Sequence, residues 1–537
     1  MSNALFLNSL VMRTRIKCFL PMFLMSTLFA VGCATVAPVT KGSISLVEQG
    51  LLKAKTGEER YNILLKTHKL AQERGTRVDY RGLKRIDITI PTNASSIPLG
   101  AVNDFENVVF NVTNNSKDFY LFAYTNKAVA VEVNGYAIDR GVFGSVTQLR
   151  TGQKVLSIED KNPWVEIRES YSYGHQRKDV LLLVNGNAKN SPVMPYGNAQ
   201  SAPVCKYYSV EHPFFQFSGI TLNRVARSTS KTYLCRIIGT NDVRLKDVVI
   251  NTPQDDMVSD AAISILDCTN VSFENVTVNG TYSRTNHAGY GISMNNVWNF
   301  KANNLRAVGN WGVFGNNNIN TAVIENSEIN RFDIHCYGRD VIFKDVVFVD
   351  LFNQFSSTFG TIRFDRCTFK AFTPVLYEAS YNSYTPHNLV FNDCVFHLTK
   401  KRNYLVSAGR LTPEENARAE LKDKCWPNVT INRMKVVVDE EADAFHVFSV
   451  NIDPKFEGSV HSVEDIFING LTFEYGNSTK AIPMNIVNRS VTTANPLNVK
   501  VNNLKTMPGA KLNLNINKGS KRNNVSVRRS TVNGVIQ

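Results

Sequence analysis

The chain has 537 residues, and its 60 Lys and Arg residues outnumber its 46 Asp and Glu residues, so its formal net charge at pH 7 is +14. A basic protein is expected to meet anionic partners. No helix-turn-helix, zinc-finger or aromatic RNA-binding signature is present, so we expect no nucleic acid. The seven cysteines beyond residue 33 are an odd number without CxxC spacing, which argues against a disulfide framework and a zinc site.

Residues 1–33 are predicted to be a lipoprotein signal peptide. Basic residues within 13–17 precede an apolar run at 19–31 that is too short for a spanning helix. Residues 30–33, Ala-Val-Gly-Cys, resemble a bacterial lipobox, in which Cys33 becomes the lipidated first residue; the alternative is a plain signal peptide cleaved nearby. We expect a protein of the bacterial cell envelope, either an outer-membrane lipoprotein (periplasmic or surface-facing) or a secreted protein. Its mature net charge falls from +14 to +11, because three basic residues and no acidic one are removed.

Residues 34–78 are predicted to form a tether and a short capping helix. Thr56-Gly-Glu-Glu opens an amphipathic segment, and Gly75 ends it. The residues at helical spacing are Tyr61, Leu64, Leu65, His68 and Ala71. Such a helix would cover the exposed core at the end of a repeat array, with His68 as an ordinary packing residue.

Residues 79–537 repeat one short phrase: an apolar residue, a spacer, a second apolar residue, and Asn or Asp two positions on. The copies begin at Phe215, Val243, Val271, Trp298, Ala322, Val341, Ile362 and Leu389, with looser copies at Val429, Ile466, Val499 and Val525. Recurrence every 19 to 28 residues in the central block indicates a solenoid. Short strands with β-branched and aromatic residues at alternate positions favour an all-β, right-handed parallel β-helix. A propeller is the alternative, but its blades need about 40 residues or more.

The repeats also predict which residues form the bends and which side chains are buried inside the coils. Asn and Asp tolerate the backbone conformation of a sharp bend. The expected bend residues are Asp247, Asn275, Asn326, Asp345, Asp393 and Asn503. Cys367 and Cys394 occupy equivalent positions in successive copies, so we interpret them as buried thiols.

Two segments interrupt the repeats. Residues 130–205 contain alternating stretches without the phrase and end in a Pro-, Gly- and Asn-rich region, which predicts a small antiparallel insertion. Within 399–428, Thr412-Pro-Glu-Glu opens a predicted short helix. That helix either walls one end of a groove or is an inert insertion.

Residues 332–337 alternate strictly between apolar and polar, which predicts a strand with one buried face. The alternation sends Asp333, His335 and Tyr337 outward together. A carboxylate, an imidazole and a phenol on one exposed face are candidate catalytic groups, with Arg339 beside them. Glycines in the strands of the two preceding coils are expected to leave a trough there.

Other side chains are candidates for binding substrate at the same trough. They are Arg284, His287, Trp311, Glu378, Asp255 and Asp256. We expect no cofactor; Asp255 and Asp256 could bind Ca²⁺, but they lack the spacing of known calcium loops.

Two chemistries fit these residues. Glycosidic hydrolysis needs two carboxylates, about 5–5.5 Å apart for retention or about 6.5–9.5 Å for inversion. Asp333 with Asp255, Asp256 or Glu378 could supply them. β-Elimination from a uronate needs a base, such as His335 or Tyr337, and a cation for the sugar carboxylate, such as Arg339 or Arg284.

Two segments around the candidate catalytic residues resemble those of a known family. Arg331-Phe-Asp-Ile-His335, following Trp311-Gly-Val-Phe-Gly315, is similar to pectin-lyase-like parallel β-helix proteins of the colanidase and phage tailspike type. The resemblance covers about residues 80 to 400 and implies action on a polysaccharide. The Gly-His-Gly and Arg-Ile-Lys signatures of pectate lyases and polygalacturonases are not matched, so no catalytic set carries over.

The sequence therefore predicts an exported, lipid-anchored β-helix that degrades an anionic bacterial or host polysaccharide by hydrolysis or β-elimination. The alternative is a non-catalytic polysaccharide-binding or cell-envelope structural protein that uses the same groove. Its oligomeric state is expected to be a monomer or, as in tailspikes, a homotrimer.

Overall fold

A computed structural model gives the coordinates of the chain. The structure describes residues 42–114, 119–165, 175–197, 202–225, 232–252, 261–280, 290–335, 337–371, 373–377, 387–408, 427–439, 441–450, 465–475, 482–487, 498–506, 512–515 and 524–528. In this part of the chain, no helix is long and apolar enough to cross a membrane.

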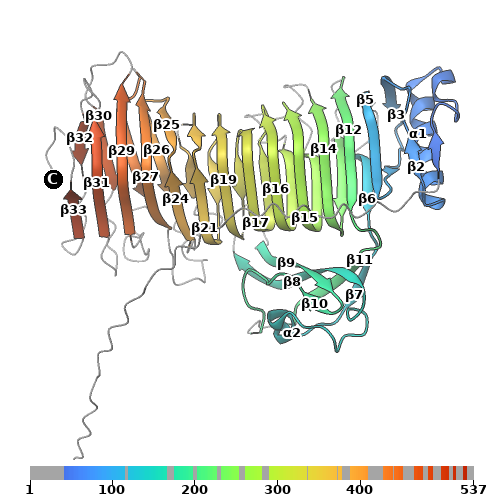
Figure 1. The fold of residues 1–537 in the computed structure, drawn as a ribbon, viewed down its shortest axis with the longest axis horizontal. Coiled ribbons are helices and arrows are strands. Elements are labelled where there is room, and N and C mark those ends of the chain that lie inside the picture. Colours follow the sequence, from blue (N-terminus) through green and yellow to red (C-terminus); the bar gives the residue numbers. More distant parts are fainter. Residues whose placement is uncertain are drawn as a thin grey trace, which may run out of the picture. The chain divides into compact units, whose positions relative to one another are not determined.

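One sheet of 26 strands contains most of the described chain, and its neighbouring strands pair in parallel from one coil to the next (Figure 1). The predicted right-handed parallel β-helix is confirmed. Its strands are β3 (Arg85–Ile90), β4 (Ile97–Pro98), β5 (Val102–Asn114), β6 (Phe119–Thr125), β12 (Phe215–Arg224), β13 (Thr232–Ile238), β14 (Asn241–Asn251), β15 (Ala261–Asn279), β16 (Tyr290–Val308), β17 (Val313–Ile329), β18 (Phe332–Ile334), β19 (Gly338–Phe348), β20 (Asn353–Phe355), β21 (Thr358–Asp365), β22 (Thr368–Phe369), β23 (Val375–Tyr377), β24 (His387–Asn392), β25 (Val395–Leu398), β26 (Arg402–Ala408), β27 (Asn428–Val438), β28 (Ala444–Val450), β29 (Asp465–Tyr475), β30 (Ile482–Val487), β31 (Asn498–Thr506), β32 (Leu512–Asn515) and β33 (Asn524–Arg528).

The register between coils confirms the predicted phrase, with one correction. The first residue of each copy from Ala322 to Val525 pairs with the first residue of the next. The copy placed at Trp298 is wrong by two residues, because Phe300 pairs with both Val271 and Ala322. Phe300 lies in the core, whereas Trp298 packs against the insertion on the outer surface.

The bends follow the predicted chemistry. All six predicted Asn and Asp residues have positive φ, between 48° and 55°. Their side chains also bond along the stack: Asn275 donates to Asp247 at 2.8 Å, and Asn304 donates to Asn275 at 2.9 Å. Each coil therefore fixes its own turn and holds the turn of its neighbour.

The core consists of side chains that stack in the same position on successive coils. The ring centroids of Phe343 and Phe364 lie 4.9 Å apart, and those of Phe364 and Phe391 lie 5.1 Å apart, all with nearly parallel rings. These spacings match the distance between neighbouring strands of a sheet. Cys367 and Cys394 are buried free thiols, as predicted.

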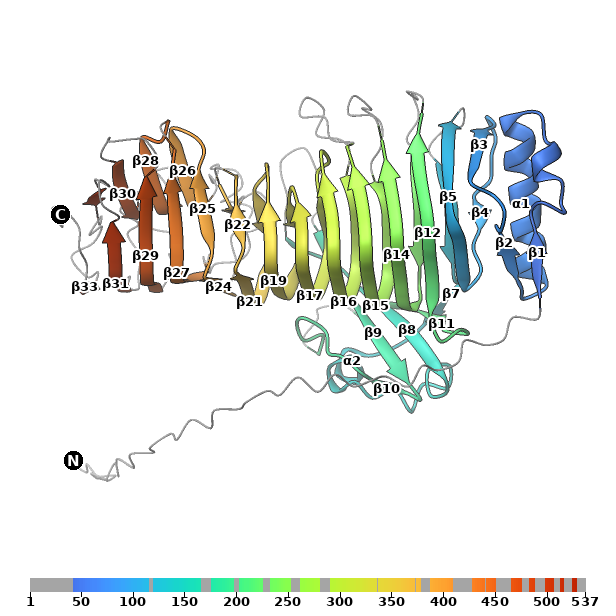
Figure 2. The same cartoon turned by 45° about the horizontal axis from the view of Figure 1, so that its top comes forward.

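The predicted capping helix is present as α1 (Gly57–Glu73), which lies against the β3 end of the stack (Figure 2). Thr56 and Glu59 form the capping box that starts it. His68 is buried, with Nε2 2.7 Å from the Tyr80 hydroxyl, and burial lowers its pKa to about 4. The other elements of this end are β1 (Ser43–Ser45), η1 (Leu51–Lys53) and β2 (Arg77–Asp79).

The antiparallel insertion is also present as a five-stranded sheet in the order β10-β9-β8-β11-β7. Its elements are β7 (Ala128–Val131), α2 (Gly135–Arg140), β8 (Gln153–Val165), β9 (His175–Val184), β10 (Asn187–Ala188) and β11 (Val204–Ser209). It contacts the β-helix at β15, β16 and β17 through β8 and β9. Buried Asp267 of the β-helix accepts hydrogen bonds from Ser157 and Tyr208 of the insertion, at 2.8 and 2.7 Å.

Two predicted segments fall on residues that the structure leaves out. They are the signal peptide at 1–33, with Cys33, and the helix that begins at Thr412. Both stay predictions, as do the domain boundaries.

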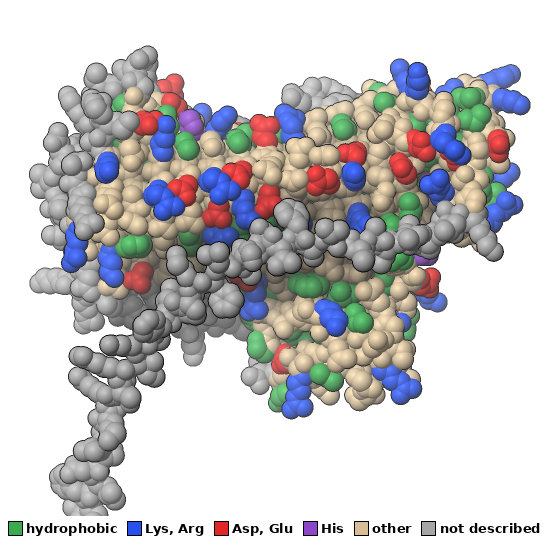
Figure 3. Space-filling view, in the orientation of Figure 1, with side chains coloured by type: hydrophobic (Ala, Val, Ile, Leu, Met, Phe, Trp, Pro, Cys, Tyr) green, Lys and Arg blue, Asp and Glu red, His purple; other side chains and the backbone are tan. Residues whose placement is uncertain are grey.

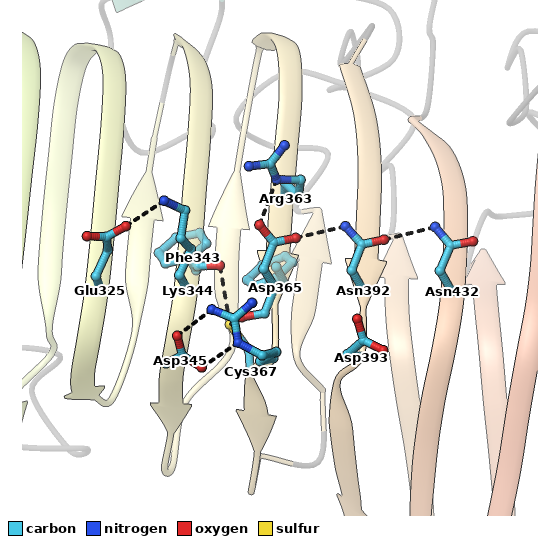
Figure 4. A network of polar contacts seen from close by, with 12 residues as sticks. Glu325, Phe343, Lys344, Asp345, Arg363, Asp365, Cys367, Asn392, Asp393 and Asn432 are labelled. Atoms are coloured by element: carbon cyan, nitrogen blue, oxygen red, sulfur yellow. Dashed lines mark hydrogen bonds and ion pairs between the residues drawn. The ribbon is translucent and has the colours of Figure 1, made fainter. Parts of the chain in front are cut away.

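Polar side chains form ladders along the outer surface near the bends (Figure 4). Lys344 lies 2.6 Å from Glu325, Asn392 donates to Asp365 at 2.8 Å, and Asn432 donates to Asn392 at 2.9 Å. Figure 3 shows acidic and basic side chains side by side along this face. Ion pairs and amide hydrogen bonds therefore link neighbouring coils along this face.

Candidate functional site

The candidate site lies on the outer face of four consecutive coils, around β18. Phe332 and Ile334 belong to the core, so Asp333 between them points away from it. Asp333 pairs in register with Phe314 of β17 on one side and Gln354 of β20 on the other. The predicted alternation is correct for these residues.

Asp333 is nevertheless fully buried, because neighbouring side chains cover it. Its Oδ2 lies 2.6 Å from Arg331 Nη2 and 3.0 Å from His335 Nε2, and it accepts a hydrogen bond from the Trp311 indole N–H at 3.2 Å. Burial alone would raise the pKa of Asp333, but Arg331, His335 and Trp311 together lower it below its usual value. Asp333 is thus a buried anion that is held by its partners.

Arg331 supplies the balancing charge from a buried position. Its guanidinium lies between two aromatic rings, 4.1 Å from the centroid of Trp311 and 4.3 Å from that of Phe352. Its Nη2 also donates to Gln354 Oε1 at 2.9 Å. Stacking on rings suits a planar, weakly hydrated cation, so Lys at this position could not make the same contacts.

His335 follows β18 and is the accessible member of the group, with 14% of its side chain exposed. Its backbone N–H donates to Gly315 O at 3.0 Å, and its ring meets Phe314 edge to face at 4.5 Å. The contact between Nε2 and Asp333 fixes the orientation of the imidazole ring. The Asp–His pair has the arrangement of an oriented general base.

A cluster of aromatic rings contacts His335 through Phe314 on the same outer face. Tyr290 stacks on Phe314 at 4.5 Å and meets Trp311 edge to face at 6.0 Å. Tyr290, Trp311 and Phe314 are all partly exposed. We call Tyr290, Trp311, Phe314 and His335 the aromatic surface; such rings can contact the apolar faces of a bound chain.

The predicted glycine trough is wrong. Gly291, Gly312 and Gly315 are buried, and a Cβ on each would collide with neighbouring atoms: those of the next coil at Gly291 and Gly312, and the Ile319 side chain of the same strand at Gly315. At Gly312 the colliding group is the backbone of Arg331. These glycines allow coils to approach each other closely, instead of leaving an open floor.

Tyr337 and Arg339 do not share the face of His335, so the prediction of one common exposed face is wrong for them. Tyr337 is buried under the insertion, where its hydroxyl donates to Asp179, and its pKa is raised well above the usual value by burial. Arg339 donates to the backbone carbonyl of Val193 at 2.8 Å. Both residues hold the insertion in place. These contacts do not test their predicted catalytic roles, which stay predictions.

The remaining predicted residues divide into two groups. Trp311 is brought to the site, where it contacts Asp333 and Arg331. The others lie outside the described residues, and their roles stay predictions: Arg284, His287, Glu378, Asp255 and Asp256. The described part of the chain contains no group of three His, Cys, Asp or Glu residues that could hold a metal ion.

The sequence patterns point to His335 and Trp311, but not to Arg331 as the charge partner of Asp333, nor to Tyr290 and Phe314 of the aromatic surface. Phe352 and Gln354, which contact Arg331, also carry no distinctive sequence signal. The available signal was that aromatic residues recur in the strands before successive phrases. The register between coils is needed to know which of these aromatic residues are neighbours: Phe314 pairs with Ser293 on one side and with Asp333 on the other.

Comparisons with known proteins identify the class of fold. No protein-family model matches the sequence, and no curated protein matches it either. Among solved structures, gp54 tailspike of Acinetobacter baumannii bacteriophage AP22, in complex with A. baumannii capsular saccharide, is 10% identical, with a TM-score of 0.51 over 89% of this chain and 78% of the tailspike chain.

A second similar structure is the tailspike protein gp49 from Pseudomonas phage LKA1. It is 13% identical, with a TM-score of 0.53 over 84% of each chain. Together these structures establish that the chain has a tailspike-like β-helix fold.

Proposed function

We propose that the protein binds and cleaves a polysaccharide at the aromatic surface, with His335 as the group that transfers a proton. The observation that carries this proposal is the His335–Asp333 pair, in which a buried anion 3.0 Å away orients a partly exposed imidazole. The tailspike fold, which in one similar structure is in complex with capsular saccharide, supports a polysaccharide as the ligand.

β-Elimination fits the described residues better than hydrolysis by paired carboxylates. Asp333 is fully buried and ion-paired, so it is not available to protonate or attack a glycosidic bond. A base beside the sugar carboxylate is what elimination needs first, and His335 has the geometry for it. An anionic polysaccharide as substrate agrees with the net charge of +14.

Polysaccharide binding without cleavage is the second candidate. It is favoured by the same burial, because Asp333 and Arg331 neutralise each other and Asp333 is not exposed as a catalytic carboxylate. An aromatic surface alone is sufficient for recognition of a sugar chain.

One assay separates these functions. The purified protein is incubated with a panel of acidic polysaccharides, and new reducing ends are measured together with absorbance near 235 nm. New ends with absorbance indicate elimination, new ends without it indicate hydrolysis, and binding without new ends indicates the second candidate.

His335→Ala is the decisive variant. We expect turnover to fall about 10²- to 10⁴-fold, because a general base contributes about that factor. His397→Ala is the matched control, since His397 is a partly buried histidine on β25, away from β18. Equal turnover in wild type and His335→Ala would reject the assignment of His335.

We also propose export with a lipid anchor at Cys33, on the basis of the signal-like residues 1–33. Metabolic labelling with palmitate tests this anchor. Label in the wild type that persists in Cys33→Ala would contradict it.

A further inference from the structure

A hollow on the C-terminal coils, far along the stack from β18, has the features of an anion-binding site. It spans β27, β29 and β31 and has a volume of about 400 Å³. Its lining includes Arg433, Lys435, Gly470, Thr472, Asn503 and Lys505. We call it the Gly470 groove.

The groove exists because one bend lacks a side chain. Arg433, Gly470 and Asn503 occupy the left-handed bend of successive coils, with φ of 54°, 91° and 55°. Most other bends fill this position with Asn, Asp or Arg side chains that bond along the stack, as Arg433 does with Asp393. Gly470 interrupts that ladder and leaves room between Arg433 and Asn503.

Two lysines lie beside the groove at equivalent positions on the first and third of its three coils. Lys435 pairs with Thr472, and Thr472 pairs with Lys505 on the next coil. Strands one coil apart are about 4.8 Å apart, so the two lysine backbones lie about 10 Å apart, with the Thr472 hydroxyl between them. The Lys505 ammonium and the Thr472 hydroxyl can both contact one carboxylate, while Lys435 is already paired with Glu474.

The groove has one cation, Lys505, that is left over after its other two cations are paired with carboxylates. Its lining contains three cations and no carboxylate. Arg433 is paired with Asp393 outside the lining, and Lys435 is paired with Glu474. Within the part of the chain that the structure describes, Lys505 makes no ion pair. An incoming anion would therefore meet Lys505 without displacing a carboxylate.

We infer that the Gly470 groove binds the carboxylate of an acidic sugar unit. The inference rests on the proposed function for its ligand class and adds a second contact point for the same polymer, remote from His335. Such a remote site would hold a long chain on the β-helix and leave cleavage at His335 unchanged for short substrates.

Titration calorimetry with a defined probe tests the groove. The probe is a heparin octasaccharide, which carries carboxylates and sulfates, and the reference is a neutral dextran octasaccharide at the same low ionic strength. We expect the acidic probe to bind and the neutral one not to bind. No binding of the acidic probe to the wild type would overturn the inference.

Matched lysine variants locate the site. Lys505→Gln is expected to weaken binding about tenfold, since it removes a charge-assisted hydrogen bond. Lys500→Gln removes the same charge from the same strand β31, outside the lining, and is expected to change binding less than twofold. Equal weakening in both variants would mean that the probe senses only net charge, which would overturn the groove.

Gly470→Asn tests the hollow itself. Asn tolerates the left-handed conformation that this bend requires, and its side chain would fill the space beside Arg433, whose Cα lies 3.3 Å from a Cβ built at this position. We expect binding to be lost while circular dichroism still shows the folded β-helix, with a lower thermal midpoint because a Cβ at φ 91° is strained. Unchanged binding in a folded Gly470→Asn variant would reject the groove.

These outcomes are independent of the proposed function. If His335→Ala retains turnover but Lys505→Gln weakens binding, the catalytic assignment fails and the groove stands. If turnover depends on His335 but the two lysine variants behave alike, the groove fails alone. Competition by millimolar inorganic phosphate as strong as that by glucuronate would reassign the ligand to a phosphate group and overturn the acidic sugar.

Discussion

Two carboxylates on the outer side of the β-helix are fully buried, but they have opposite electrostatics. Asp333 lies 2.6 Å from the Arg331 guanidinium, and its pKa is lowered despite burial. Asp179 of the insertion accepts hydrogen bonds from the hydroxyls of Tyr196 and Tyr337, and burial raises its pKa to about 6. Burial alone therefore does not fix the charge of a carboxylate; a cation in contact with it does.

The difference also separates two uses of a buried carboxylate. Ion-paired Asp333 keeps its negative charge and orients His335, which suits a site of proton transfer. Asp179 accepts hydrogen bonds from neutral donors, and the one from the Tyr337 hydroxyl attaches the insertion to the β-helix. Buried polar networks of this second kind specify how two parts of a fold meet.

Removal of the cation beside Asp333 should give the largest loss of stability. We expect Arg331→Met to lower the free energy of unfolding by about 3–5 kcal/mol, because it leaves a buried carboxylate without its charge partner. Urea denaturation at pH 7 measures this loss.

The double variant Arg331→Met, Asp333→Leu is the control for that experiment. It removes both charges, so most of the lost stability should return. A single variant that loses less than about 1 kcal/mol would show that Asp333 does not depend on the ion pair, and the contrast with Asp179 would fail.

The raised pKa of Asp179 predicts a pH dependence of stability with a definite sign. Between its unfolded value of 3.8 and its folded value of about 6, the folded protein keeps a proton that the unfolded chain has lost. The contribution of Asp179 to stability should therefore fall as pH rises from about 4 to about 6, by about 3 kcal/mol, and level off above that range.

Asp179→Asn isolates this contribution, because the amide has the same size and does not titrate. The free energy of unfolding of wild type minus that of the variant should decline across pH 4–6. A difference curve that is flat, or that rises as expected for a carboxylate with a lowered pKa such as Asp333, would contradict the assignment.

The smallest effect is expected for an exposed pair on the polar ladder of Figure 4. Lys344 and Glu325 lie 2.6 Å apart, but 36% and 38% of their side chains are exposed. Lys344→Gln should therefore change the free energy of unfolding by less than about 1 kcal/mol, and less still at high salt. A loss as large as that of Arg331→Met would mean that burial does not distinguish these ion pairs.

The local patterns were sufficient for the repeat and its bends. The phrase at Val341, Ile362 and Leu389 predicted strands that pair in register, and the Asn and Asp residues predicted the left-handed bends. The error at Trp298 arose because an aromatic residue that packs on the insertion imitates the first apolar position of the phrase.

The candidate site was predictable only in part. The alternation of 332–335 correctly sent Asp333 and His335 away from the core, but it contained no information about what covers that face. Tyr337 is buried because it meets Asp179, which is 158 residues away in the sequence. The buried Arg331 depends in the same way on Trp311 and Phe352, which come from the coils on either side.

The sequence by itself determined the β-helix, its capping helix and its bends, because each of these depends on side-chain preferences repeated within a few residues. Only the tertiary structure decided which outward side chains are accessible and which carboxylates keep their charge. Those properties depend on neighbours that stacking and the insertion bring together, and no local spacing encodes such contacts.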